Sequence, residues 1–431
     1  RSDLSGSSVS MSEESIKGSI VSSLDQTLQG RAAGVTAVQT SGAPGSSSSI
    51  RVRGQATINA NAEPLYVIDG VIVQGGGDSG ASFGLGDALG NGKVSTISPL
   101  STINPADIVS MEILKDASAT AIYGAQGANG VVLVTTRRGS GEAGKLRVTY
   151  DSYYAIQALH KNPETFSLDE WLVLNEKRGK ADYGGRIENA YWNALRNDKP
   201  TYDLNQYISL AGSTTRSNYN LSFNYSDRNQ LYKNNDRQTY NLRFLMSQKM
   251  LNNIIETTTI AQLRAYVSNG NGGSLTGTIF MNPTQPVYDA TTPTGYYWPT
   301  SSTGATNPVE NNQVPTNQSH STTINIQQDI KATFIKNDNH LLTANANVAF
   351  GYYSSYGHSY TPSTMQTCQM WNSYAGSASL DSSNNLTSNF EAMINYNLAL
   401  EKHSLKAVAG YSYRQYMGES MNMTNRNFQY D

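Results

Sequence analysis

The chain has 431 residues, a formal net charge of −2 at pH 7 and a mean hydropathy of −0.46. Its 31 basic and 33 acidic residues nearly cancel, which gives no reason to expect nucleic-acid binding, and the single cysteine, Cys368, excludes an internal disulfide and a cysteine-based zinc site. No apolar run approaches the roughly 20 residues that a membrane helix needs. A search for long apolar runs does not detect membrane-spanning strands, because only every second residue of such a strand faces lipid.

The first 140 residues are predicted to form a compact α+β domain of short strands joined by turns. The apolar pair 67–68 runs into Asp69 and Gly70, a dipeptide typical of turns. Residues 131–134 form an apolar run that predicts a buried strand.

A further strand is predicted over residues 107–114, with Val109, Met111 and Ile113 on one side. Asp116 then occupies an N-cap position before a predicted helix of small residues over 117–123. On pattern alone, an unrelated soluble α+β domain fits these elements as well.

The order of several sequence blocks is more specific than the pattern. The blocks are LQGRAAGV at 28–35, IRVRG at 50–54, EPLYVIDG at 63–70, INPADI at 103–108, MEILKDASATAIYG at 111–124 and GANGVVLVTT at 127–136. Together they closely resemble the plug of SusC/RagA-type TonB-dependent outer-membrane transporters. The resemblance implies a TonB-dependent receptor plug domain over residues 1–140 and a transmembrane β-barrel after it.

A long glycine-rich insertion lies between Val73 and Ile97. In the family that the chain resembles, the corresponding plug loops face the substrate cavity. The groups of this insertion best suited to contact cargo are Asp78, Phe83, Asp87 and Lys93. Packing against the barrel wall is the structural alternative, and calcium binding is disfavoured because the two Gly-x-Gly-Asp copies are too few and in the wrong order.

From about residue 145 onward, apolar and polar residues alternate with a period of two. Between 218 and 226, for example, aromatic and aliphatic residues occupy every odd position and Asn or Ser every even one. Such alternation predicts strands with one apolar face and one polar face. On this basis Leu221, Phe223, Ile394 and Leu398 are assigned to the lipid side. The predicted strands are 146–157, 205–211, 218–226, 239–248, 255–267, 324–335, 341–353, 389–401 and 405–414.

The connections between these strands alternate in length. Short ones are predicted near 212–217, 250–254, 336–340 and 401–404, and long ones near 158–204, 229–237, 269–320 and 356–386. Bacterial barrels have short periplasmic turns and long extracellular loops in this order, which a soluble sandwich has no reason to follow. The plug and the short turns are therefore expected in the periplasm, and the long loops outside the cell. Two helices, at 168–178 and 187–196, are predicted within the first long loop.

Nine strands are too few for a closed barrel around a plug. Bacterial barrels have an even number of strands, and plugged lumens go with about 22 strands. A plug of this size has a radius of gyration of about 14 Å, which does not fit inside nine strands. We therefore expect a transmembrane antiparallel β-barrel of 22 strands in the full protein, with the α+β plug in its lumen. Residues 141–431 are predicted to be the N-terminal portion of that barrel.

Sequence motifs for catalysis are missing. The five histidines lack metal-binding spacing, and neither His-Glu-x-x-His nor Gly-x-Ser-x-Gly occurs. We therefore predict no enzyme, no cofactor and no metal site. In the long loops, the aromatic residues predicted to contact substrate are Tyr288, Tyr296, Trp298 and Trp371.

The resemblance implies a nutrient importer in the outer membrane. The expected cargo is an oligosaccharide or oligopeptide, and the expected partners are a SusD-like lipoprotein lid and the TonB-ExbB-ExbD energising complex. A dimeric SusC–SusD assembly is compatible with it. A siderophore or cobalamin receptor shares the architecture but usually lacks these blocks. A third alternative, an outer-membrane adhesin or enzyme, needs either no plug or a positioned nucleophile or metal.

Overall fold

The computed structural model describes residues 8–12, 28, 30–39, 48–54, 64–69, 71–73, 108–116, 127–136, 144–158, 165–179, 191–197, 200–229, 231–270, 277–278, 281–299, 306–337, 339–371, 375–400 and 403–428. The predicted helix at 117–123 and most of the glycine-rich insertion lie outside these ranges. Among the residues described, no helix is both long enough and apolar enough to cross a membrane.

The N-terminal part contains a five-stranded sheet and a separate two-stranded sheet. In the larger sheet the strand order is β1-β6-β7-β4-β5, and the β4–β7 pair is parallel while the other pairs are antiparallel. The bounds are β1 Ser8–Ser12, β4 Leu65–Ile68, β5 Val71–Val73, β6 Ile108–Leu114 and β7 Val131–Thr136, while β2 Val35–Gln39 and β3 Ser48–Val52 form the small sheet.

The two small sheets share an apolar core. Side chains from β2, β3, β4, β6 and β7 pack together in it, among them the fully buried Ile50, Met111 and Val132. One predicted position is wrong: Val109 is exposed, whereas Met111 and Ile113 are buried. The β6–β7 register shifts between Ile108 and Ser110, and this irregularity turns Val109 away from the core.

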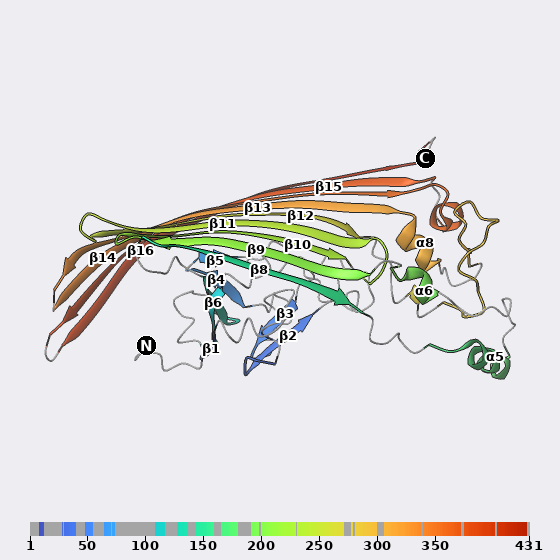
Figure 1. The fold of residues 1–431 in the computed structure, drawn as a ribbon, viewed down its shortest axis with the longest axis horizontal. Coiled ribbons are helices and arrows are strands. Elements are labelled where there is room, and N and C mark those ends of the chain that lie inside the picture. The colour runs from blue at the N-terminus through green and yellow to red at the C-terminus, as the bar shows by residue number, and fades with distance from the viewer. Residues whose placement is uncertain are drawn as a thin grey trace.

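The C-terminal part is one antiparallel sheet of nine strands in which every strand pairs with its neighbour in sequence (Figure 1). The bounds are β8 Leu146–Gln157, β9 Thr201–Ser213, β10 Ser217–Asn229, β11 Asn235–Met250, β12 Ile255–Gly270, β13 Thr316–Lys336, β14 His340–Thr361, β15 Ser377–Ala399 and β16 Ser404–Arg426. All nine predicted strands are present. The plug strands lie along one face of this sheet (Figure 1).

The short turns fall where the sequence predicted them, at 214–216, 251–254, 337–339 and 400–403. Two of the predicted long loops are shorter than expected. The connection predicted at 229–237 is only the five residues 230–234, and the one predicted at 356–386 shrinks to 362–376 because β14 and β15 continue through it.

The nine-stranded sheet has inverted burial: its apolar residues are exposed and its polar residues are buried, the opposite of a soluble protein. On β10, Phe223 is 41% exposed, whereas its neighbour Ser222 is 3% exposed. The register aligns Phe223 with Ile208 on one side and with Leu242 on the other, so the exposed apolar residues form rows across the strands. The predicted lipid-facing residues Leu221, Phe223 and Ile394 are exposed, and Leu398 shares the face of Ile394.

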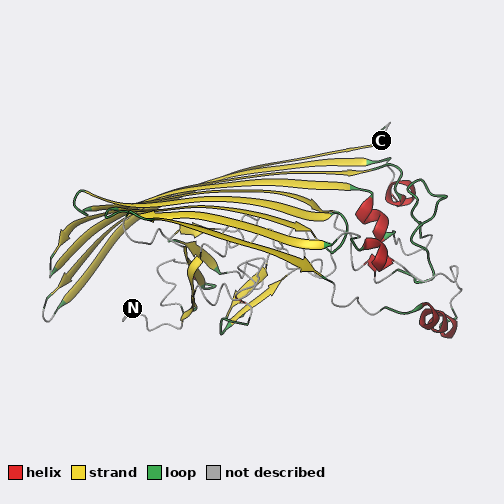
Figure 2. Ribbon diagram, viewed as in Figure 1, coloured by secondary structure: helices red, strands yellow, loops and turns green. Residues whose placement is uncertain are grey.

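Helices lie at one end of the sheet, opposite the short turns (Figure 2). Within the described residues they are α5 Leu168–Lys177, α6 Tyr191–Leu195, α8 Pro308–Gln313 and the π-helical turn η4 Thr367–Trp371. Helix α5 confirms the prediction at 168–178 and begins with a capping box between Ser167 and Glu170. Helix α6 covers the second half of the segment predicted at 187–196.

Candidate functional site: a plug–wall contact and an outer-loop platform

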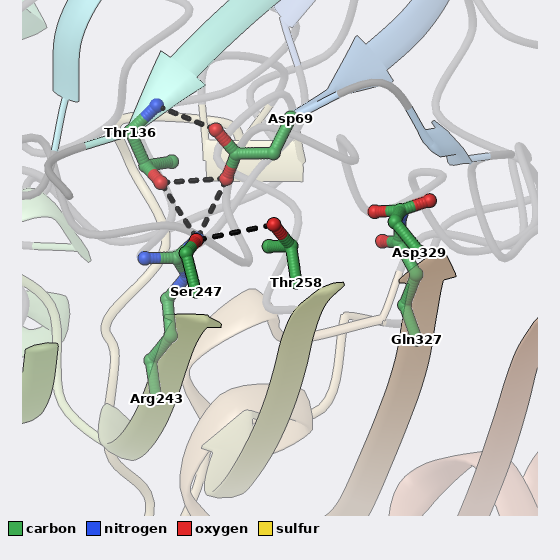
Figure 3. A network of polar contacts seen from close by, with 7 residues as sticks. All are labelled: Asp69, Thr136, Arg243, Ser247, Thr258, Gln327 and Asp329. Atoms are coloured by element: carbon green, nitrogen blue, oxygen red, sulfur yellow. Dashed lines mark hydrogen bonds and ion pairs between the residues drawn. The ribbon is translucent and has the colours of Figure 1, made fainter. Parts of the chain in front are cut away.

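The plug is joined to the sheet by a buried network of three residues (Figure 3). Arg243, on β11, donates from Nη2 to Asp69 Oδ2 at 2.6 Å and to Thr136 Oγ1 at 2.6 Å. The Thr136 hydroxyl in turn donates to Asp69 Oδ2 at 2.6 Å. Only 5% of the Arg243 side chain and 2% of the Asp69 side chain are exposed. We call this network the plug–wall contact.

The plug sequence places Asp69 and Thr136 together. Strand β4 runs parallel to β7, so the ends of the two strands meet at the same edge of the plug sheet. Asp69 follows β4 with a positive φ of 50°, a conformation that aspartate tolerates better than most residues. Its backbone N–H donates to Val134 O and its Oδ1 accepts from Thr136 N, both at 2.9 Å, which fixes the carboxylate facing the wall.

The energetics of the plug–wall contact favour a firm attachment. A buried ion pair gains little over an apolar pair of the same shape, because both charges lose their hydration. Removing one partner is costly, by about 3–5 kcal/mol, because the other charge stays buried without compensation. Loss of either partner is therefore expected to loosen the plug, whereas a displacement that exposes both charges to water leaves neither charge buried and unpaired.

A second ordered region lies at the loop end of the sheet and consists of α6, residues 281–299 and α8. We call it the outer-loop platform. Its apolar centre contains Tyr191, Leu195, Met281, Val287 and Val309. The Tyr191 hydroxyl donates to Pro286 O at 2.8 Å, and Gln313 Nε2 donates to Ala194 O at 2.9 Å, so both helices are tied to the same core.

Asn307 shows why this loop is ordered. Its Oδ1 caps α8 by accepting from Val309 N at 3.0 Å, and its Nδ2 donates to Val287 O at 2.9 Å and to Tyr297 O at 3.0 Å. One buried amide thus stabilises both the helix terminus and two turns of the chain before it.

Glu310 is the buried acidic centre of the platform. Its Oε1 accepts from Thr294 Oγ1 at 2.5 Å, from Trp298 Nε1 at 3.1 Å and from the backbone N of Gln366 at 3.4 Å. Burial raises the pKa of Glu310, although these three hydrogen bonds favour its charged form. Among the described residues, Oε2 has no hydrogen-bond partner.

A raised pKa makes the platform sensitive to pH. The folded form of Glu310 holds its proton more tightly than the unfolded form, so stability is fully present below the ordinary carboxyl pKa and falls as the pH rises above it. Glu310→Gln is expected to remove this dependence, whereas Glu310→Ala should cost about 1–3 kcal/mol at any pH because it leaves the Trp298 indole unsatisfied. Proteolysis of the outer loops at several pH values measures both effects. An unchanged pH profile in Glu310→Gln contradicts the assignment.

The structure brings some of the predicted substrate-binding residues together. Tyr288 and Tyr296 form an isolated bridge with ring centroids 5.4 Å apart, and Tyr288 is exposed. Trp298 lies in the same platform but directs its indole N–H to Glu310. Trp371 ends η4. Asp78, Phe83, Asp87 and Lys93 lie outside the described residues, so their role stays a prediction.

The sequence reasoning missed Asp69, Arg243, Asn307 and Glu310 as functional or organising residues. Arg243 carried a signal, because it is a charged residue on the polar face in the middle of a strand. Its partner lies 174 residues away in sequence, and no local pattern identifies such a pair. No group of three or more potential metal ligands occurs in the part of the chain that the structure describes.

Comparison with known sequences gives a consistent result. The family model described as the TonB-dependent Receptor Plug Domain matches residues 1–131. TonB-dependent receptor P26 of Formosa agariphila is 36% identical over 304 residues, which are 67% of this chain and 28% of that protein. TonB-dependent receptor SusC of Bacteroides thetaiotaomicron is 30% identical over 324 residues, which are 72% of this chain and 30% of that protein.

Solved structures share the fold. The RagAB peptide importer in its open-open state superposes with a TM-score of 0.77 at 21% identity, over 100% of this chain and 49% of the compared chain. The ferric citrate transporter FecA superposes with a TM-score of 0.59 at 11% identity, over 98% of this chain and 49% of its own. The chain spans less than a third of the curated relatives described above. With its plug, its nine-stranded barrel sheet and its SusC-like sequence, the chain belongs to the SusC/RagA type of TonB-dependent receptor.

Proposed function

We propose that the protein is an outer-membrane, TonB-dependent importer of oligomeric nutrients, either oligosaccharides or oligopeptides. The plug closes the path through the barrel at rest, and energy from the periplasm moves it. A SusD-like lipoprotein covers the outer loops and delivers the cargo.

The inverted burial of the sheet carries the membrane part of this proposal. Exposed apolar rows face away from the plug, while Asn220, Ser222 and Asn224 are buried on the plug side. In water such a surface is a liability, but in a lipid bilayer it is the stable arrangement for a barrel strand.

The plug–wall contact supports the import part. A pore that is always open needs no plug, so a plug held against the wall at rest is expected in a transporter that opens only during import. The contact between Asp69, Thr136 and Arg243 is compatible with reversible displacement, because its charges are rehydrated once water enters.

The relatives support the proposed partners and cargo class. SusC of Bacteroides thetaiotaomicron is described as a TonB-dependent receptor, and RagAB as a peptide importer. For this chain, a SusD-like lid and the TonB-ExbB-ExbD complex are therefore proposed. The outer-loop platform is the surface for the lid, because its buried centre gives it a fixed shape.

Cysteine labelling tests the orientation. Thr291 is exposed in the outer-loop platform and Thr215 is exposed in a short turn at the other end of the sheet. We expect Thr291→Cys in the full-length protein to react with a membrane-impermeant maleimide on intact cells and Thr215→Cys to react only after lysis. The native Cys368 is buried and serves as the background. Labelling of Thr215→Cys alone on intact cells reverses the orientation.

Growth on defined substrates tests the importer itself. A strain that lacks the full-length gene is expected to lose growth on one class of oligomer as sole carbon or nitrogen source and to keep growth on the matching monomers. Monomers diffuse through ordinary porins, so they are the internal control. Unimpaired growth on every oligosaccharide and oligopeptide tested overturns the proposal.

A further inference from the structure

The inner face of the sheet carries a group of arginines near the loop end of β10, β11 and β12. Arg228 lies directly opposite Arg237 in the β10–β11 ladder. The guanidinium carbon of Arg237 lies 3.8 Å from the centre of the Tyr266 ring, and that of Arg264 lies 5.6 Å from it. Arg237 and Arg264 therefore share one tyrosine ring.

Among the described residues, one inward carboxylate of β9–β13 lies close to this group of three arginines. Asp203 binds Arg228 through a 3.1 Å ion pair. The other described carboxylates that face inward on β9–β13 are Asp329 and Glu256, which lie further toward the short turns. Like charges placed directly opposite each other destabilise a sheet, so the arrangement has a cost that folding alone does not explain.

The burial and hydrogen bonding of Arg264 are a second observation that points to a ligand. The residue is 5% exposed, and its Nε has no hydrogen-bond partner among the described residues. Directly across the ladders lie Asn241 on β11 and Thr323 on β13, neither of which carries charge. A buried guanidinium without an anion is costly, and a carboxylate or sulfate group satisfies it through paired N–H donors.

The surrounding side chains favour a sugar over a peptide. The neighbouring inward positions are Thr239, Asn241, Ser268, Ser321 and Thr323, which offer hydroxyls and amides to the hydroxyl groups of a sugar ring. The apolar inward residues Leu245 and Ile260, which a peptide side chain would use, lie further toward the short turns.

We propose that Arg237, Arg264 and Tyr266 form an anion-binding subsite on the barrel wall for the carboxylate or sulfate groups of an acidic oligosaccharide. This inference rests on the proposed import function and names its cargo class. Because both arginines are buried at rest, the subsite acts during passage of the cargo and not during its first capture at the cell surface.

Uptake by cells that carry the full-length protein tests the subsite. The probes are a short oligogalacturonate and the same oligosaccharide with its carboxyl groups reduced to alcohols, with a sulfated oligosaccharide and an acidic peptide as further arms. Arg264→Gln is expected to lower uptake of the two acidic oligosaccharides about tenfold, the effect of losing one charge-assisted contact. Uptake of the reduced oligosaccharide is expected to stay unchanged.

Two further variants separate charge from folding. Arg264→Lys keeps the charge and should retain most of the uptake of acidic oligosaccharides. Asn241→Asp places a carboxylate opposite Arg264 without changing the size of the side chain, and it should reproduce the loss even if Arg264→Gln reaches the membrane poorly. Arg216→Gln, in an exposed short turn, is the matched control and should have no effect.

The outcomes distinguish this inference from the proposed function. If the wild-type protein takes up neither acidic nor neutral oligomers, the importer proposal itself fails. If it takes up oligosaccharides but Arg264→Gln and Asn241→Asp slow acidic and reduced cargo equally, or slow neither, the subsite is overturned. A selective loss for the acidic peptide alone overturns the assignment to sugars.

Discussion

Breaking the plug–wall contact from one side is expected to loosen the plug by about 3–5 kcal/mol, which is more than a hundredfold in the equilibrium between closed and open plug. In Asp69→Asn the buried Arg243 loses its counter-ion, and in Arg243→Met the buried Asp69 loses its cation. Hydrogen exchange of the plug strands β4 and β7 in the full-length protein measures this opening. Both single variants should exchange much faster than the wild type.

The double variant Asp69→Asn with Arg243→Met is expected to recover a large part of the loss, because no uncompensated charge remains. The exposed pair of Arg53 and Asp116 within the plug is the matched control. Arg53→Met should cost no more than about 1 kcal/mol, since solvent already screens that pair. Strictly additive effects in the double variant, or single variants as slow as the wild type, refute the attachment.

Leu242→Arg is expected to destabilise the folded barrel by about 2–4 kcal/mol in lipid, because it places a charge near the middle of the lipid-facing surface. Leu242 lies midway along β11 and pairs with Phe223 and Leu263 in an apolar row. Folding titrations of the full-length protein into lipid vesicles measure this cost.

Met250 provides the matched control on the same strand and the same face. Met250 is 42% exposed and Leu242 is 41% exposed. Met250 is the last residue of β11 and lies eight residues, or about 26 Å, from Leu242. Met250→Arg should cost only about 0–1 kcal/mol, because this end lies near the membrane surface. A water-facing sheet tolerates both changes alike, within about 0.5 kcal/mol. Equal costs therefore contradict the membrane face.

Alternation revealed all nine strands but underestimated their length. Strand β14 was predicted at 341–353 and extends to Thr361, and β15 begins at Ser377 and not at residue 389. The added segments are rich in Ser, Asn and Gly, and only a few outward positions such as Tyr356 and Leu386 are apolar, so the alternation is weak there. The hydrophobic period reports only the apolar band of a barrel strand, whereas the backbone ladder continues beyond it.

The same limit applies to the sites. The local cap at Ser167 and the turn at Asp69 are readable from the sequence, because neighbouring residues make them. The pairing of Asp69 with Arg243 depends on how the plug lies against the wall, and the register irregularity that exposes Val109 depends on β7. The division between plug and barrel at residue 140 stays a prediction.

TonB-dependent uptake is the measurement that tests the central claim most directly. Cells that carry the full-length protein, with and without a functional TonB, are given a fluorescently labelled oligomer on which the wild type grows. With TonB, we predict energy-dependent accumulation of the oligomer in the periplasm, and without TonB we predict binding at the cell surface alone. In cells without TonB, the oligomer should leak into the periplasm only when Asp69→Asn or Arg243→Met loosens the plug. Equal accumulation with and without TonB in the wild type contradicts the account.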